Sequence, residues 1–292
     1  FDLKMAAPPK LANNKSNQYE IIFDLNGIGS SGFTEADVMV HFHKTFDRAS
    51  NLTLDQKIET LWLEKCVANP MIFNADKFRF HSYAYQQTES PKLSFEIGLT
   101  NYRDYIGTHL QEPNEHQELI ERGLSEGNAL KYFSCALGCE AVLSTSDDFI
   151  ILLRRTSHVA THAGLFNGPS GHPEPHHLFK GPNQTISSNI SSSDERTSNS
   201  SFWTKYENVS SGLVVNELFS SVIDEVVSET GLNTTDLNMP LLIGAMKDSG
   251  GKPDLLFLVS TNLTAEQARK RPLSIVLLFS FFLLSFRFDM WL

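Results

Sequence analysis

The sequence predicts an α/β protein, because segments with helical periodicity alternate with segments that have strand patterning. The best-defined helix lies within Asn216–Leu232, where apolar residues recur at three- and four-residue steps and Gly231 suits a left-handed C-terminal cap. The best-defined strand lies within Asp147–Thr156, whose continuous apolar run is typical of a central strand. Alternating residues at Tyr83–Tyr85 and Leu93–Leu99 predict a hairpin.

The amino-terminal part of the chain begins with a polar segment and a strand. Residues 1–18 are rich in Pro and Asn, so we expect a loose segment there. A strand is expected at Tyr19–Leu25, followed by a Gly/Ser turn at Gly27–Gly32. Phe33–Phe42 alternates enough to predict either a second strand or a short helix.

A longer helix is expected at Thr53–Asn69, with Thr53 as its N-cap. Its predicted inner face consists of Ile58, Leu61, Trp62 and Cys66. Residues 111–127 are polar and acidic, and they predict a loop with a short helix between two lobes.

The carboxy-terminal part predicts two strands at Met239–Met246 and Asp254–Ser260, joined by a Gly-rich turn at Ser249–Gly251. A helix is expected to begin near Leu263. Leu273–Phe286 is a dense apolar run of 14 residues, shorter than the roughly 18–20 that span a bilayer. A membrane tail is therefore the minority interpretation of this run.

The composition is that of a globular protein. Of the 292 residues, 41% are hydrophobic and 20% are charged. A net charge of −10 with no basic stripe argues against nucleic acid as a partner. The three cysteines, Cys66, Cys135 and Cys139, lack Cys-x-x-Cys spacing and are interpreted as reduced thiols of a cytosolic protein. A zinc site at Cys135 and Cys139 would need further donors.

Two glutamates on the best-defined helix are candidates for metal ligands. Glu225 and Glu229 are four residues apart, so they lie on one side of the helix. Most such pairs are solvated surface, but Glu229 projects to the edge of the apolar stripe. No Lys or Arg between Val214 and Leu232 neutralises them. Oxygen ligands of this kind suit Mg²⁺, with Mn²⁺ as the alternative.

The residues around this pair resemble a Nudix box, the metal-binding motif of a family of diphosphate hydrolases. Residues 224–232 match its end at both outer glutamates, the glycine and both apolar positions. Gly-His-Pro-Glu-Pro at 171–175 and Glu-Leu-Phe-Ser-Ser-Val at 217–222 resemble the UDP-glucose pyrophosphatase branch, in which an insertion divides the box. The resemblance extends from about residue 19 to about residue 270.

The resemblance implies a Nudix α/β/α sandwich with a mixed sheet and a smaller amino-terminal α+β lobe. It implies Mg²⁺-dependent hydrolysis of UDP-glucose and UDP-galactose to UMP and a sugar 1-phosphate. Glu225 and Glu229 would be the catalytic metal ligands. The residues that would bind the nucleotide sugar are Phe73, Tyr102, Arg155, Asn167, His172 and Glu174. Physically, an aromatic face can stack on a base and an arginine can grip a diphosphate.

The chain also departs from the family pattern. Asp224 replaces the arginine of the box, Ser228 replaces its middle glutamate, and Asn167 stands where relatives carry an acid. The family's further strand and carboxy-terminal helix are not recognisable in residues 273–292. Two alternatives therefore stay open: a catalytically impaired protein that binds nucleotide sugars, and a Nudix hydrolase of another nucleoside diphosphate derivative.

The predicted organisation has four parts. They are a loose segment at 1–18, an amino-terminal lobe at 19–128, a Nudix domain at 129–272 with a flexible insertion at 176–212, and a divergent apolar tail at 273–292. The expected partner is a small nucleotide sugar, without nucleic acid or membrane. No export signal precedes Pro8, so a cytoplasmic location is expected, with the nucleus as a second compartment.

Overall fold

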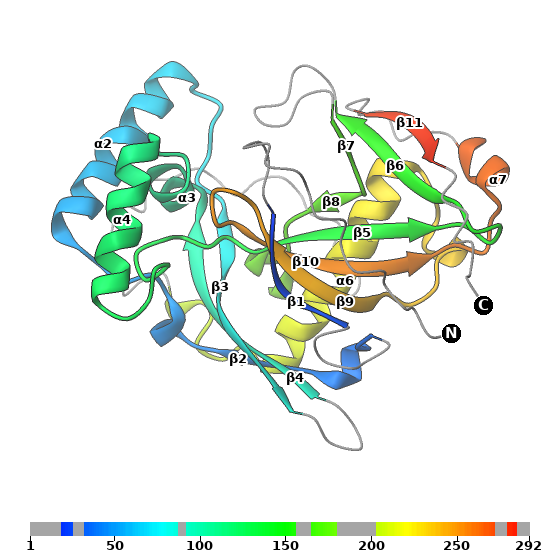
Figure 1. Ribbon diagram of the computed structural model, residues 1–292, viewed down its shortest axis with the longest axis horizontal. Coiled ribbons are helices and arrows are strands. Elements are labelled where there is room, and N and C mark those ends of the chain that lie inside the picture. The colour runs from blue at the N-terminus through cyan, green and yellow to red at the C-terminus, as the bar shows by residue number, and fades with distance from the viewer. Residues whose placement is uncertain are drawn as a thin grey trace, which may run out of the picture.

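The computed structural model describes residues 19–25, 32–86, 92–155, 165–179, 203–271 and 279–284. The strands form a larger mixed sheet and a smaller three-stranded sheet, and helices lie around them (Figure 1). The protein therefore belongs to the α/β class that the sequence predicts. The segment 1–18, Gly27–Ser31 of the predicted turn and most of the insertion lie outside the described residues.

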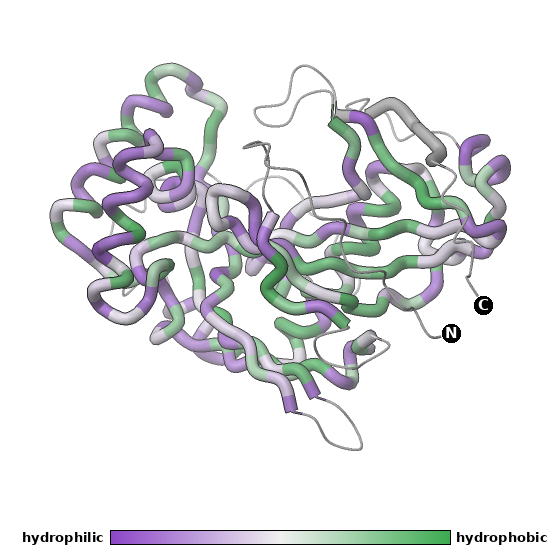
Figure 2. Tube along the Cα trace, in the orientation of Figure 1, coloured by the Kyte–Doolittle hydropathy of each residue, from purple (hydrophilic) through white to green (hydrophobic). Residues whose placement is uncertain are grey.

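The larger sheet consists, in chain order, of β1 (Glu20–Asp24), β5 (Gly138–Ser144), β6 (Ile150–Arg155), β7 (Phe166–Asn167), β8 (Ser170–Gly171), β9 (Leu241–Lys247), β10 (Pro253–Ser260) and β11 (Phe279–Leu284). Its spatial order is β1-β9-β10-β5-β6-β11, while β7 pairs with β6 and β8 with β5. The pair β10–β5 is parallel and its neighbours are antiparallel, so the sheet is mixed. Figure 2 shows that apolar residues colour the central strands β5, β9 and β10.

The smaller sheet has the order β2-β4-β3, with β2 at Val38–Phe42, β3 at Asp76–Gln86 and β4 at Lys92–Asn101. The hairpin β3–β4 confirms the alternation seen in the sequence. Both interpretations of Phe33–Phe42 hold, because the 3-10 helix η1 (Glu35–Asp37) leads directly into β2.

The α-helices of the described chain are α2 (Leu52–Ala68), α3 (Tyr102–Thr108), α4 (Pro113–Ser125), α6 (Ser211–Thr230) and α7 (Ala265–Arg269). Three more 3-10 turns occur at η2 (Lys44–Phe46), η3 (Pro175–Phe179) and η4 (Thr234–Asp236). Among the described helices, none combines the length and apolar character needed to cross a bilayer.

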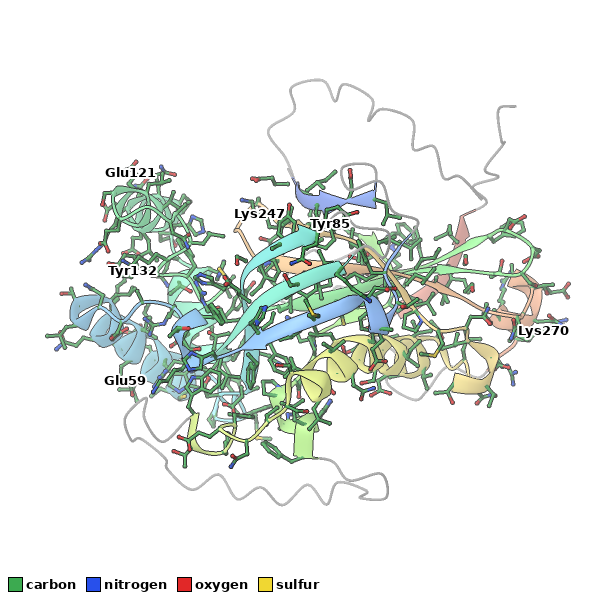
Figure 3. All side chains as sticks on the ribbon, turned by 90° about the horizontal axis from the view of Figure 1, so that it is seen from below. Glu59, Tyr85, Glu121, Tyr132, Lys247 and Lys270 are labelled. Carbon is green, nitrogen blue, oxygen red and sulfur yellow. The ribbon has the colours of Figure 1, made fainter. Side chains whose placement is uncertain are left out.

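Helix α6 confirms the main sequence prediction. The Ser210 hydroxyl caps its first turn, and Gly231 ends it with φ 71°, a conformation that only glycine adopts at little cost. The apolar stripe packs between β5 of the larger sheet and β2 of the smaller one, and Figure 3 shows α6 running along the strands. Leu218 and Val222 at its centre are fully buried. Burying this stripe is what fixes the helix between the two sheets.

One hydrophobic core includes residues of both sheets. The Phe23 ring of β1 lies 4.9 Å from the Tyr83 ring and 6.1 Å from the Phe95 ring, measured between centroids. Strand β1 pairs with β9, so it belongs to the larger sheet although it precedes residue 128. The amino-terminal strand therefore crosses the boundary that the sequence suggests between the lobes.

The N-cap predicted for α2 is wrong. Asn51, not Thr53, caps the helix, because its side-chain oxygen accepts the Leu54 N–H at 3.1 Å. The Asp55 carboxylate accepts the Asn51 N–H in return at 3.1 Å, which fixes the start two residues earlier. Of the predicted inner face, Ile58 is buried, while Leu61, Trp62 and Cys66 are half-buried.

The end of the insertion is not loose, which corrects the prediction for 176–212. Trp203 and Tyr206 are buried in the core. Trp203 Nε1 donates to Asp47 at 2.6 Å, and the Tyr206 hydroxyl donates to Asp76 at 2.9 Å. The segment is polar overall, so its two aromatic residues are easily overlooked in the sequence. Both can be buried because each polar group donates a hydrogen bond to an aspartate.

The tail also differs from expectation. Phe279–Leu284 forms β11, which pairs antiparallel with β6 from Phe279 opposite Arg155 to Leu284 opposite Ile150. The prediction that no strand follows residue 272 is therefore wrong. An aromatic and aliphatic run has high strand propensity, and β6 offers it an open edge of the sheet.

Candidate active site

The candidate site is built around the loop from Gly168 to Glu174, which precedes η3. Short strand β8 attaches the loop to β5. The Gly168 N–H donates to the Glu140 carboxylate of β5 at 2.9 Å. The Ser170 N–H donates to the Glu229 carboxylate of α6 at 3.0 Å. One carboxylate from the sheet and one from the helix therefore position this loop.

Both outer glycines of the loop are required by close contacts. A Cβ on Gly168 would lie 2.0 Å from the Ala141 carbonyl oxygen. A Cβ on Gly171 would lie 1.8 Å from Glu225 Oε1. The Glu225 carboxylate thus lies directly against the loop backbone, in space that only glycine leaves open.

Glu225 is held where its negative charge is unfavourable. Burial, and after it the neighbouring carboxylates of Glu174 and Asp224, raise the pKa of its carboxyl to about 7. The His172 backbone N–H and the Lys77 ammonium act in the opposite direction. A cation at this carboxylate would remove the electrostatic cost of ionising it.

Glu174 joins the loop to the other lobe. Its carboxylate forms an ion pair with Lys77, from the first residues of β3. The side chains are 26% and 13% exposed, so the pair is well shielded from water. The Glu174 N–H donates to Glu217 of α6 at 3.0 Å. This ion pair places a positive charge next to the carboxylates of the loop.

His172 is close enough to two lysines to be affected by their charges. Burial lowers the pKa of its imidazole well below the usual value, and the charges of Lys252 and Lys77 lower it further. The ring is therefore neutral at pH 7. Lys252 forms an ion pair with Asp254 of β10, and burial raises the pKa of that aspartate. The site thus combines carboxylates with two ammonium groups, as a bound diphosphate requires.

The turn that carries Lys252 is clamped by two histidines from the other lobe. His109 Nδ1 donates to the Gly250 carbonyl at 2.8 Å, and its Nε2 accepts the Cys135 N–H at 2.9 Å. His116 Nε2 donates to the same carbonyl at 3.0 Å. Burial lowers the pKa of His109 to about 4, so this ring stays neutral at physiological pH.

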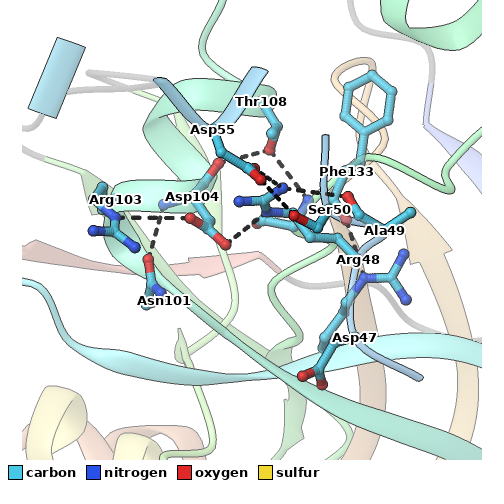
Figure 4. Close-up of polar contacts among 12 residues, drawn as sticks. Asp47, Arg48, Ala49, Ser50, Asp55, Asn101, Arg103, Asp104, Thr108 and Phe133 are labelled. Carbon is cyan, nitrogen blue, oxygen red and sulfur yellow. Dashed lines mark hydrogen bonds and ion pairs between the residues drawn. The ribbon is translucent and has the colours of Figure 1, made fainter. Parts of the chain in front are cut away.

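Helix α3 carries aromatic residues that pack on each other and on α2. The Tyr102 ring lies 6.3 Å from Trp62 and 6.4 Å from Tyr105, between centroids. Arg48 fixes this helix by pairing with Asp104 at 2.7 Å and with Asp55 at 2.7 Å (Figure 4). The first turn of α3 is thereby tied to the start of α2.

The structure brings some of the predicted site residues together. His172 and Glu174 belong to the loop, and Glu225 and Glu229 of α6 contact it at Gly171 and Ser170. Asn167 Nδ2 donates to Ser170 at 2.8 Å, while its buried Oδ1 has no hydrogen-bond partner among the described residues.

The remaining predicted residues lie on other elements. Phe73 lies between α2 and β3 and is 74% exposed. Tyr102 starts α3. Arg155 is the last residue of β6, and its side chain lies outside the described part of the structure.

Sequence reasoning missed Lys77, Lys252, Glu140 and Glu217. Lys77 fits the polar positions of the alternating strand β3, so it carried no signal of its own. Lys252 follows a Gly-rich turn and carried no signal of its own. The pairing of Lys77 with Glu174 joins residues 97 positions apart, and no local pattern predicts such a contact.

Comparisons with known proteins show which proteins this chain resembles. Uridine diphosphate glucose pyrophosphatase NUDT22 of Homo sapiens is 33% identical over 248 residues, covering 83% of this chain and 75% of that protein. The Mus musculus protein of the same name is 33% identical over 247 residues, covering 83% and 73%. Nudix hydrolase 9 of Arabidopsis thaliana is 29% identical over 261 residues, covering 87% and 77%.

Among solved structures, the Nudix hydrolase RenU of M. smegmatis has a TM-score of 0.22 at 11% identity, covering 47% of this chain and 60% of that one. No family model matches the sequence. The relatives and the carboxylate-lined loop define a hydrolase that acts on phosphoric anhydrides. The chain belongs to the Nudix hydrolase family. Enzymes of this family generally need divalent metal ions.

Proposed function

We propose that this protein hydrolyses the diphosphate bond of UDP-glucose and UDP-galactose to UMP and a sugar 1-phosphate, with Mg²⁺ as its metal. The proposal is supported by relatives that are named as UDP-glucose pyrophosphatases. The observation that carries it is the buried carboxyl of Glu225, which lies against Gly171 and beside Glu174. A cation bound there would favour the ionised form of this carboxyl, whose pKa is raised to about 7.

The donor set fits a hard divalent ion. Glu225 and Glu229 contact the loop at Gly171 and Ser170 and offer only carboxylate oxygens, which Mg²⁺ prefers and Mn²⁺ accepts. When bound, such an ion supplies a Lewis acid and a water of lowered pKa. The proposed metal ligands are therefore Glu225 and Glu229.

The other residues would bind and orient the substrate. Lys77 and Lys252, whose charges both act on His172, would offset phosphate charge, and the neutral His172 ring offers one donor and one acceptor. Arg155 is proposed to grip the diphosphate, and Asn167 and Glu174 to position the loop against it. Phe73 and Tyr102 would hold the uracil by stacking and hydrogen bonding.

The two substitutions within the Nudix box, at Asp224 and Ser228, do not remove a side chain that contacts this loop. Ser228 is exposed, and its hydroxyl donates to the Glu225 carbonyl of its own helix at 3.1 Å. Asp224 is exposed as well. Both substitutions lie on the outer side of α6. The proposal of hydrolysis is therefore preferred to that of an impaired binding protein.

The test compares Glu225→Gln with the parent chain. The variant should lose at least about 100-fold in turnover of UDP-glucose with Mg²⁺, because it removes a ligand charge at the metal that stabilises the transition state. Released UMP and sugar 1-phosphate are measured with Mg²⁺, with Mn²⁺ and with a chelator. UDP-galactose and ADP-ribose are compared as substrates.

Glu121→Gln on the exposed face of α4 is the matched control and should keep parental turnover. A thermal melt of each variant verifies that the fold is intact. Equal turnover by Glu225→Gln and the parent would remove Glu225 from the metal site. Hydrolysis of ADP-ribose in preference to UDP-glucose would refute the proposed substrate class.

A further inference from the structure

A second group of possible metal ligands lies at the start of η3. Glu174, His176 and His177 each direct one ligand atom toward a common point, and these atoms lie within 4.8 Å of one another. His176 Nδ1 is 3.0 Å and His177 Nε2 is 3.9 Å from the same oxygen, Glu174 Oε2. Atoms that bind one ion at about 2.1 Å are at most about 4.2 Å apart, so both contacts meet this limit.

The Glu174 carboxylate is fixed in the orientation that a ligand needs. Its two oxygens are divided between different partners: Lys77 pairs with Oε1, while Oε2 faces the two imidazoles. The Glu174 N–H is held by Glu217 at 3.0 Å. Such outer contacts typically hold a metal-binding carboxylate in place.

His177 is oriented by a second carboxylate. Its Nδ1 lies 3.0 Å from Glu217 Oε1, and Glu217 is only 8% exposed. A carboxylate can only accept, so His177 Nδ1 donates to Glu217, and Nε2 is the ring nitrogen that faces Glu174 Oε2. Nε2 and Oε2 are 3.9 Å apart, so one ion could contact both atoms. A carboxylate behind a histidine is the usual outer arrangement of transition-metal sites.

We propose that Glu174, His176 and His177 bind a transition-metal ion of the Zn²⁺ class, at a site distinct from the one formed by Glu225 and Glu229. Two imidazoles and one carboxylate suit Zn²⁺, Co²⁺ or Ni²⁺, whereas Mg²⁺ prefers oxygen ligands. Three protein ligands leave a coordination position for water or a phosphate oxygen. The inference concerns metal binding alone and does not depend on the proposed substrate.

The experiment measures metal binding directly in the full chain. Co²⁺ is titrated in the presence of excess Mg²⁺, which fills the oxygen site, and its visible absorption reports nitrogen ligands. Calorimetric titration with Zn²⁺ gives the affinity. The parent chain and the double variant Glu225→Gln/Glu229→Gln should both show the Co²⁺ band and bind one Zn²⁺ per chain.

His176→Gln and His177→Gln should each lose the band and weaken Zn²⁺ binding at least about tenfold. His41→Gln, an exposed position on β2, is the matched control and should bind as the parent does. Thermal melts verify that every variant is folded.

The proposal is overturned if the parent chain shows no band at full Co²⁺ loading. It is also overturned if the band survives in both histidine variants, or disappears only in the double glutamate variant. That last outcome would place the ion at Glu225 and Glu229, and it would leave the proposed hydrolysis intact.

Discussion

Glu225 makes the stability of the metal-free protein depend on pH. The pKa of its carboxyl is about 7 in the folded chain, against an ordinary value of 4.5. Between pH 4.5 and pH 7, the folded chain therefore keeps a proton that the unfolded chain has lost. The cost of ionising the buried carboxyl is present above pH 7 and disappears as the pH falls toward 4.5. Relative to a neutral side chain, Glu225 therefore destabilises the fold only at higher pH.

We expect Glu225→Gln to be more stable than the parent at pH 8, and we expect this difference to be several-fold smaller at pH 5, both in chelator. The free energy of unfolding is measured by urea melts of the two chains from pH 5 to pH 8. Taking the difference between the chains cancels other titrations, such as the neutral His109 that must gain a proton on unfolding. A difference that does not change with pH would show that the pKa of Glu225 is not raised.

The two loop glycines should respond differently to alanine. Gly171→Ala meets the end of a flexible side chain, so Glu225 moves away while the backbone stays in place. Turnover should fall about 100-fold with little change in stability, since a displacement of about 1 Å can cost that much.

Gly168→Ala instead meets the Ala141 carbonyl of β5, which cannot move alone. We expect this variant to lose about 1–3 kcal/mol of stability. Urea melts and UDP-glucose turnover of both variants distinguish the two responses. Equal loss of stability in both variants would show that the clash at Gly171 is not relieved by movement of the Glu225 side chain.

At the scale of elements, the end of the insertion anchors the smaller sheet. Trp203 packs on Phe42 of β2, with centroids 4.8 Å apart, and its indole donates to Asp47. Trp203→Ala should cost about 3–5 kcal/mol of unfolding free energy. The exposed Leu213→Ala on α6 should change stability by less than about 0.5 kcal/mol. Similar urea midpoints for the two variants would show that the segment does not support the core.

The sequence predicts elements whose signals are local. The helix α6 is recognisable because its stripe, its glycine cap and its carboxylates all lie within one segment. The metal pair and the loop follow from the same segment and from the resemblance to the family. The N-cap of α2 escaped prediction because the Asp55 carboxylate, not the first hydroxyl, decides where that helix begins.

The rest depends on contacts between distant residues. Lys77 and Lys252 reach the site only because β3 and the β9–β10 turn are brought to it by tertiary structure. Strand β1 could be predicted, but not its pairing with β9. The tail strand β11 needs the edge of β6, which is visible only once the sheet is assembled.

At the scale of the whole molecule, the shared core predicts cooperative unfolding. Phe23, Phe95 and Val222 belong to one cluster although they come from β1, the smaller sheet and α6. We therefore expect a single transition in which far-ultraviolet circular dichroism and tryptophan fluorescence coincide. Two separated transitions would show instead that segments 19–128 and 129–272 fold as independent domains.

The two histidine hydrogen bonds to the Gly250 carbonyl affect the entropy of ligand binding. One carbonyl accepts from both His109 and His116, so the turn that carries Lys252 is fixed to the opposite lobe before any ligand arrives. Parting the lobes would break both bonds. The conformational entropy of this turn is thus lost during folding, and we expect the proposed nucleotide ligand to meet a rigid surface here. Ligand binding then does not lose further conformational entropy by immobilising that turn.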